Sequence, residues 1–289
     1  MGTSGSSKGS PGNVPIVPPW VPPVPAAAPE GASPPDGATP GPPVAPGQQP
    51  APIAPTVPAP SPIASARRFV AARRSAGSFA ETGNDRDLKR SMRHYVQKGY
   101  GGSRTAASRF GGTIQNAGSL YSALAPSSAA AARAPGEPTI DRTLLAGRSA
   151  LEVIDAVIDA VQPSNGTQDA EASRTAIKGA LSELLQRFPD ADLLELSDEQ
   201  REFAIERYVG FDVYQRFALD LGKIIQDKAP SPTTALRRLK EVKDYIKETV
   251  SASFRKLKAA GQSLSRGSVS RTVQAALADA LSVFEHYRE

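Results

Sequence analysis

Apolar residues recur at steps of three and four along the second half of the chain, which is the spacing of amphipathic helices. Five such segments follow one another between residues 139 and 289, and short turns rich in Pro, Gly and Ser separate them. The pattern predicts an antiparallel helical bundle over 139–289. No segment shows the strict alternation of a strand, so the expected fold class is all-α.

Polar residues mark where these helices begin. Ser149 and Glu152 form a capping box before the first helix, which Pro163 ends, and Ser197 caps a long helix further on. The other segments are 169–188, a helix opened by Ser231-Pro232, and 269–287. The residues expected to face the core are Leu151, Ile154, Ile158, Val161, Ile177, Leu181, Leu184, Phe188, Phe203, Tyr208, Gly210, Tyr214, Phe217, Leu221, Ile224, Leu239, Val242, Ile246, Val250, Leu257, Val273, Leu277, Ala280, Leu281 and Phe284.

Residues 63–125 carry shorter helical patterns. Residues 65–79 predict one helix, and Asn84 or Asp85 caps a second helix that runs to Lys98, with Gly99 as its stop. A ten-residue repeat follows, in which Tyr100-Gly101-Gly102-Ser103 returns as Phe110-Gly111-Gly112-Thr113. We interpret each copy as a turn whose Ser or Thr caps the next helix, giving helices over 103–109 and 113–124. An Ala/Ser/Pro-rich linker, 126–138, separates this segment from the bundle.

The first 62 residues have a different composition. They hold 20 of the 27 prolines, and from Pro11 onwards they consist largely of Pro, Ala, Gly and Val. Such a chain samples polyproline II and buries almost nothing, so we expect a long disordered tail over 1–62. Fully extended, the stretch from Pro11 to Pro62 reaches on the order of 150 Å. Trp20, the only tryptophan, stands among its prolines as a docking anchor or an incidental exposed residue.

The tip of the tail offers an amine. Removal of Met1 exposes the Gly2 α-amine, whose pKa is about 8, followed only by small residues. Three interpretations stay open: a solvated chain end, an N-myristoylation pattern through Ser6, and a substrate for a modifying partner.

Composition excludes several kinds of chemistry. The chain has no cysteine, and His94 and His286 have no ligand-spaced partner, so we expect no thiol catalysis, no metal site and no cofactor. No apolar run is long enough to span a membrane or form a secretion signal, which indicates a cytoplasmic protein. Asp155 and Asp159 lie at i, i+4 on a polar face and are expected at the solvated surface. With no nucleophile and base grouped together, we expect no enzyme.

The positive charge is concentrated in one segment. Residues 65–109 hold 11 Lys and Arg against 3 Asp and Glu, although the whole chain carries only +5. Clustered cations attract phosphates or acidic proteins. The sequence motifs of phosphate-binding loops are absent. The segment is thus an ordinary solvated face, a docking site for an acidic partner, or a nucleic-acid contact. The candidate contact residues are Arg67, Arg68, Arg73, Arg74 and Arg90.

The order of several motifs resembles the QatB family of the bacterial Qat anti-phage defence system. The resemblance is specific over residues 1–125 and rests beyond them on a helical body of similar kind. The motifs that carry it are Met1-Gly2-Thr3-Ser4, Val17-Pro18-Pro19-Trp20, the proline-rich spacer, Ala66-Arg67-Arg68-Phe69, His94-Tyr95-Val96, Gly99-Tyr100-Gly101-Gly102-Ser103 and Arg109-Phe110-Gly111-Gly112-Thr113.

This resemblance implies both partners and a role. Qat operons encode an ATPase (QatA), a QueC-like enzyme of deazapurine chemistry (QatC) and a TatD-like nuclease (QatD). QueC-like enzymes in defence operons join a deazaguanine-type base to the terminal glycine amine of a partner. The resemblance therefore implies a non-catalytic scaffold subunit with Gly2 as acceptor, and with Thr3, Ser4, Gly5 and Trp20 recognised by the partner. The alternative from the residues alone is a nucleic-acid adaptor that uses the basic segment 65–109.

Overall fold

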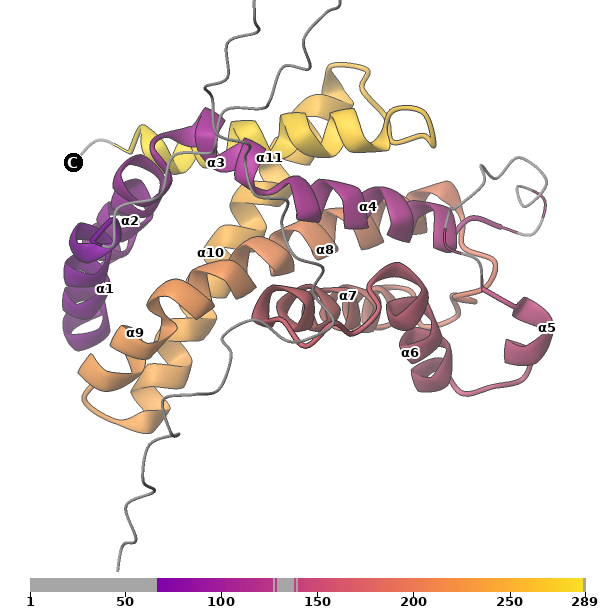
Figure 1. Ribbon diagram of the computed structural model, residues 1–289, viewed down its shortest axis with the longest axis horizontal. Helices are drawn as coiled ribbons and strands as arrows, with labels where there is room; N and C mark the ends of the chain where they lie inside the picture. The colour runs from indigo at the N-terminus through magenta and orange to yellow at the C-terminus, as the bar shows by residue number, and fades with distance from the viewer. Residues whose placement is uncertain (1–66, 127, 129–137, 139, 288–289) are drawn as a thin grey trace, which may run out of the picture. The chain divides into compact units, whose positions relative to one another are not determined.

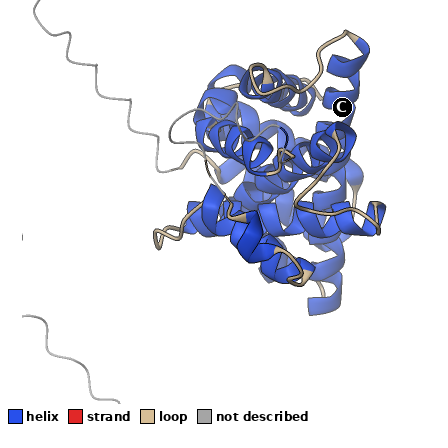
Figure 2. Ribbon diagram, turned by 90° about the vertical axis from the view of Figure 1, so that its right-hand side faces the viewer, coloured by secondary structure: helices blue, strands red, loops and turns tan. Residues whose placement is uncertain are grey.

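The computed structural model describes residues 67–126, 128, 138 and 140–287. The chain divides into two units, 1–60 and 61–289, and every described residue belongs to the second. The predictions for the tail lie outside the described residues. Within the described part every regular element is a helix and none is a strand, so the all-α class is confirmed (Figure 2).

Short connections join most of the elements, and two of them, η1 and η3, are π-helical turns that continue a neighbouring α-helix. Their bounds are α1 (Val70–Thr82), α2 (Asp85–His94), η1 (Tyr95–Tyr100), α3 (Ser103–Arg109), α4 (Gly111–Ala123), α5 (Arg142–Leu145), α6 (Ala150–Val161), α7 (Gln168–Arg187), α8 (Asp198–Phe217), η3 (Ala218–Gly222), α9 (Lys223–Lys228), α10 (Pro232–Ala259) and α11 (Val269–Glu285).

Helix α8 is the centre of the helical unit. It packs against α7, α10 and α4 (Figure 1), while α10 also packs on α11. The helices of the basic segment join the same assembly, because α3 and α4 lie on α11 and α1 packs between α2 and α9. One continuous core therefore connects the basic segment to the bundle.

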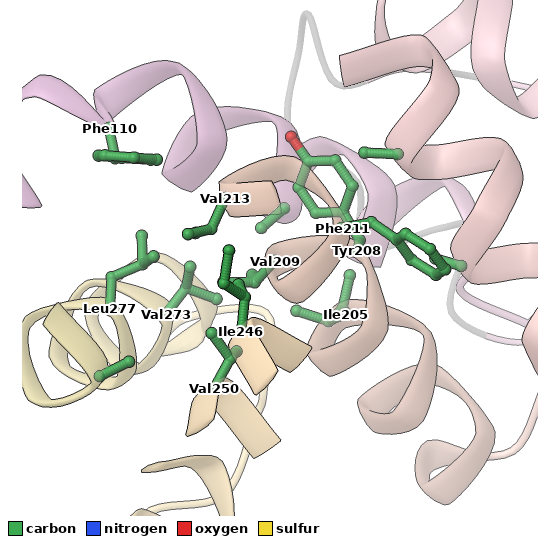
Figure 3. Packing of buried hydrophobic residues seen from close by; sticks show 14 of the residues in the cluster. Phe110, Ile205, Tyr208, Val209, Phe211, Val213, Ile246, Val250, Val273 and Leu277 are labelled. Carbon is green, nitrogen blue, oxygen red and sulfur yellow. The ribbon is translucent and has the colours of Figure 1, made fainter. Parts of the chain in front are cut away.

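The core is made by the apolar faces that the sequence pattern predicts. Figure 3 shows Ile205 and Val209 of α8 facing Ile246 and Val250 of α10, with Val273 of α11 beside them. All five are at most 1 % exposed. Burying a side chain of this size contributes about 1.5–3 kcal/mol, which is the main term that holds these helices together.

Three helices begin at the capping residues that the sequence predicts. Ser149 and Ser197 both form complete capping boxes, with Glu152 and Gln200 reaching back to the cap backbone. Ser231 caps α10 ahead of Pro232 in the first turn. These local contacts satisfy backbone N–H groups that lack helical partners, and a sequence can specify them because both residues lie within one turn.

Two local predictions were wrong. Gly99 does not stop α2: the chain continues as η1, and Gly101, at φ +82°, ends it. Gly99 instead lies against the Phe69 ring, where a Cβ would stand 2.3 Å from Phe69 Cε1. Leu151, expected in the core, is 61 % exposed because α6 buries the face carrying Ile154 and its neighbours.

The repeat does not cap helices in the expected way. Helix α3 does begin at Ser103, but its cap is Gly102, and the Ser103 N–H is donated to the Glu285 carboxylate at 2.9 Å. Helix α4 begins at Gly111, so Thr113 lies inside it and is fully buried. The Ser103 backbone N–H and the Thr113 hydroxyl therefore serve tertiary contacts, with Glu285 and Asp212 respectively.

Candidate functional site: two aspartates beside the aromatic-glycine repeat

The predicted arginines divide between two helical surfaces. Arg68 is half-buried, with its guanidinium 4.6 Å from the Phe69 ring centroid. Arg73 is exposed on α1 and its guanidinium donates to the Asp220 carbonyl at 3.4 Å, while Arg67 and Arg74 are exposed nearby in the chain. Arg90 lies on α2 and pairs with Asp87 at 3.5 Å. The structure brings Arg68 and Arg73 together around Asp220, and Arg90 belongs to a separate helix.

Asp220 lies at the centre of an aromatic cluster. Its carboxylate accepts hydrogen bonds from the Tyr95 hydroxyl at 3.0 Å and the Tyr100 hydroxyl at 3.5 Å. Burial raises the pKa of the Asp220 carboxyl, although the Tyr95 hydrogen bond and the Arg68 charge oppose that rise. Burial also raises the pKa of Tyr95 well above its ordinary value, so both phenols stay protonated donors.

Both π-helical turns of the described residues contribute to this cluster. Tyr95 and Tyr100 are the first and last residues of η1, and Asp220 is in η3. A π-turn widens the helix by one residue and is often found at functional sites. Here the two turns direct the three polar side chains toward one another.

A second aspartate is completely buried eight residues earlier. Asp212 of α8 is 0 % exposed and accepts hydrogen bonds from Thr113 at 2.5 Å and from Ser173 at 2.6 Å. Arg216 Nε donates to the same carboxylate at 3.0 Å. Burial lowers the pKa of the Arg216 guanidinium, but the Asp212 charge outweighs that effect and the pKa is raised overall. A buried charge in such a place is tolerated because it is paired and hydrogen-bonded.

The ten-residue repeat supplies part of both sites. Its first copy gives Tyr100 to Asp220, and its second gives Thr113 to Asp212 and Phe110 beneath the Arg216 guanidinium, 5.3 Å from the ring centroid. Sequence reasoning missed both aspartates. Two carboxylates at i, i+8 on the inward side of a long amphipathic helix were the signal that could have revealed them.

Other acidic residues behave as predicted. Asp155 and Asp159 are exposed and lie 3.8 Å and 2.8 Å from the cations of Lys178 and Arg174. The described residues contain no group of three His, Cys, Asp or Glu that could hold a metal ion. No helix among them is long and apolar enough to cross a membrane.

The predicted acceptor and recognition residues belong to the first 20 residues of the chain. Gly2, Thr3, Ser4, Gly5 and Trp20 all lie outside the described residues. Their roles stay predictions.

The fold and its two sites define an all-helical protein organised around two hydrogen-bonded aspartates, Asp212 fully buried and Asp220 half-buried. A comparison with protein-family models matches residues 101–284 to QatB, the Qat anti-phage system associated protein. The chain belongs to this family and is a component of Qat anti-phage defence. The match includes the second copy of the repeat, both aspartates and the helices around them. Neither the curated proteins nor the solved structures give a match.

Proposed function

We propose that this protein is the non-catalytic subunit that presents Gly2 to a QueC-like partner, QatC. In this proposal the helical unit docks the ATPase QatA and the TatD-like nuclease QatD in the cytoplasm. The observation that carries it is the Met1-Gly2-Thr3-Ser4 tip at the end of a proline-rich stretch, joined to a helical unit of this defence family.

The chemistry of the tip supports a role as acceptor. An α-amine with a pKa of about 8 has a neutral, nucleophilic fraction at pH 7. Gly2 has no side chain, and the next five residues carry nothing larger than a Thr, so the amine can enter a narrow cleft. The partner would supply ATP-dependent activation of its deazaguanine-type group, and the tail would supply the amine.

An exposed surface at the start of the described helical residues supports docking. We call Arg67, Val70, Arg73, Arg74 and Leu219 the tail-root surface. Val70 and Leu219 are 49 % and 47 % exposed, and they lie close in sequence to Arg73 and Asp220, which are in contact through the Asp220 carbonyl. Exposed apolar side chains beside exposed arginines are typical of protein interfaces. A partner that binds there would hold the tail by its attached end.

Mass spectrometry of the intact protein and its N-terminal peptide tests the acceptor role. The protein is expressed with and without the QueC-like partner, and a partner-dependent mass gain on Gly2 is expected. Deleting residues 2–7 should abolish the gain and the defence while partner assembly persists. Deleting residues 38–43 from the proline-rich stretch, a matched loss of six residues, should change neither. A bare Gly2 in both samples, or full defence without residues 2–7, contradicts the proposal.

A second candidate is a nucleic-acid adaptor that presents phage DNA to the nuclease. Arg74, which makes no ion pair among the described residues, favours it, and Arg67 and Arg73 are exposed close by in sequence. Replacing Arg67, Arg68, Arg73 and Arg74 by Gln should remove salt-dependent DNA retention. The same change at four exposed arginines elsewhere, Arg187, Arg237, Arg255 and Arg271, is the control. Equal retention by the two variants contradicts this candidate.

A further inference from the structure

A cavity of about 450 Å³ opens above the Asp212 network. Its walls come from the end of α3, from α4, from the loop between α6 and α7, and from α7 and α8. The side chains that matter for its chemistry are Arg109, Gln115, Gln162, Asn165, Asp169 and Arg216. Its volume is that of a site for a small molecule, and its lining is polar.

The floor of this cavity is a built polar network. Ser173, which lines the cavity, is 2 % exposed and donates to Asp212 at 2.6 Å. Tyr208 lies beneath with a fully buried hydroxyl that no hydrogen bond of normal geometry reaches. Figure 3 shows this hydroxyl pointing away from the apolar cluster of Ile205 and Val209. Its polar neighbours are Ser173 and Asn116, and both line the cavity. A buried hydroxyl normally has a partner, so the Tyr208 hydroxyl depends on these two cavity-lining side chains for its polar contacts.

The upper wall presents two arginines, Arg216 and Arg109, and of these the carboxylates among the described residues pair only with Arg216. Arg216 is held from within by Asp212, but its outer partner is Asp169, 3.6 Å away and largely exposed. Because the Asp169 side chain is 71 % exposed, water competes for this salt bridge. Arg109 is exposed at the same wall and has no ion pair among the described residues.

We propose that this cavity binds a small molecule that carries a phosphate group. The phosphate takes the place of the Asp169 carboxylate on Arg216, and Arg109 contacts its remaining oxygens. Two guanidinium groups match the planar, bidentate contacts that phosphate oxygens accept. The amides of Gln115, Gln162 and Asn165 line the rest of the cavity. The oxygens of Gln162 and Asn165 already accept from Asn116 and Thr167, so these two side chains offer the ligand N–H donors. This binding does not depend on the modification of Gly2.

Calorimetric titration of the full-length protein with inorganic phosphate and with 5′-AMP tests the site. Arg109→Gln should weaken binding about tenfold, because a hydrogen bond to a charged group is lost. Arg104→Gln, the same change at an exposed arginine of the same helix that does not line the cavity, should leave binding unchanged. Asp169→Asn should strengthen binding about threefold or more, because it removes the competing carboxylate.

The two cavity variants are expected to change the binding affinity in opposite directions, which a general loss of folding could not do. Both altered side chains are exposed, so the variants should keep the unfolding midpoint of the parent. Tighter binding of 5′-AMP than of phosphate identifies a phosphate ester as ligand, and equal affinity identifies free phosphate. No saturable binding of either probe overturns the proposal. So does equal weakening by Arg104→Gln and Arg109→Gln, or binding that Asp169→Asn leaves unchanged or weakens.

Discussion

At the scale of single residues, the environments of two carboxyl groups, Asp220 and Glu285, shift their pKa values in opposite directions. Burial raises the pKa of Asp220, so the folded state holds that proton more tightly than the unfolded chain. The hydrogen bond from Ser103 lowers the pKa of Glu285, so the folded state favours its ionised form. The two groups must therefore affect the pH dependence of folding with opposite signs.

Substituting each carboxylate by its amide tests this. As pH rises above the unfolded pKa of Asp220, the unfolded carboxyl ionises first, and the free energy of unfolding falls until the folded pKa is passed. Asp220→Asn removes that loss, so its stability relative to wild type should rise between about pH 4 and pH 7. Glu285→Gln should lose stability relative to wild type at lower pH, as pH rises towards the unfolded Glu pKa of about 4.3, and the difference should then stay level, because ionised Glu285 stabilises the folded state. Urea unfolding at a series of pH values measures both. A parallel trend in the two variants would contradict these assignments.

At the scale of elements, the packing of η1 depends on one glycine. A Cβ on Gly99 would stand 2.3 Å from the Phe69 ring, so Gly99→Ala should destabilise the protein by about 1–3 kcal/mol. Gly111 begins α4 with nothing within 4 Å of its Cβ position and without a positive φ. Gly111→Ala should therefore be neutral or stabilise by up to about 1 kcal/mol. Urea unfolding of both variants is the measurement, and equal effects would show that the Phe69 ring moves aside freely.

The same elements show what the sequence could and could not predict. The long helices of the bundle and three of their starts followed from local information: the 3.6-residue period, and caps such as Ser149 and Ser197 with both partners in one turn. The π-turns could not be predicted in this way, because Tyr95 and Asp220 are 125 residues apart in sequence and meet only after their helices have packed. Asp212 was missed for the same reason: its partners Thr113 and Ser173 are 99 and 39 residues away. The role of a polar residue on the apolar face of a helix depends on tertiary contacts, which the local sequence does not specify.

At the scale of the whole molecule, the chain divides at about residue 60 into a proline-rich unit and a helical unit. The basic segment belongs to the helical unit, because α3 and α4 pack on α11 and α1 packs on α9. Its positive charge is therefore presented on the surface of a packed core. This arrangement predicts that folding and partner docking belong to 61–289, while the proposed acceptor amine belongs to the tail.

Removing residues 1–60 separates these two roles. The urea dependence of unfolding scales with the surface that unfolding exposes, so a chain that starts at Ser61 should keep both the midpoint and the slope of the full-length protein, the slope to within about 10–15 %. It should also still assemble with the ATPase and the nuclease, yet give no defence, since it lacks Gly2. Urea unfolding, co-purification with the partners and phage challenge measure the three outcomes. A lower midpoint would place part of the tail in the folded unit. Defence that survives the truncation would assign the function to the helices alone, and the cavity above Asp212 would then be the first site to examine.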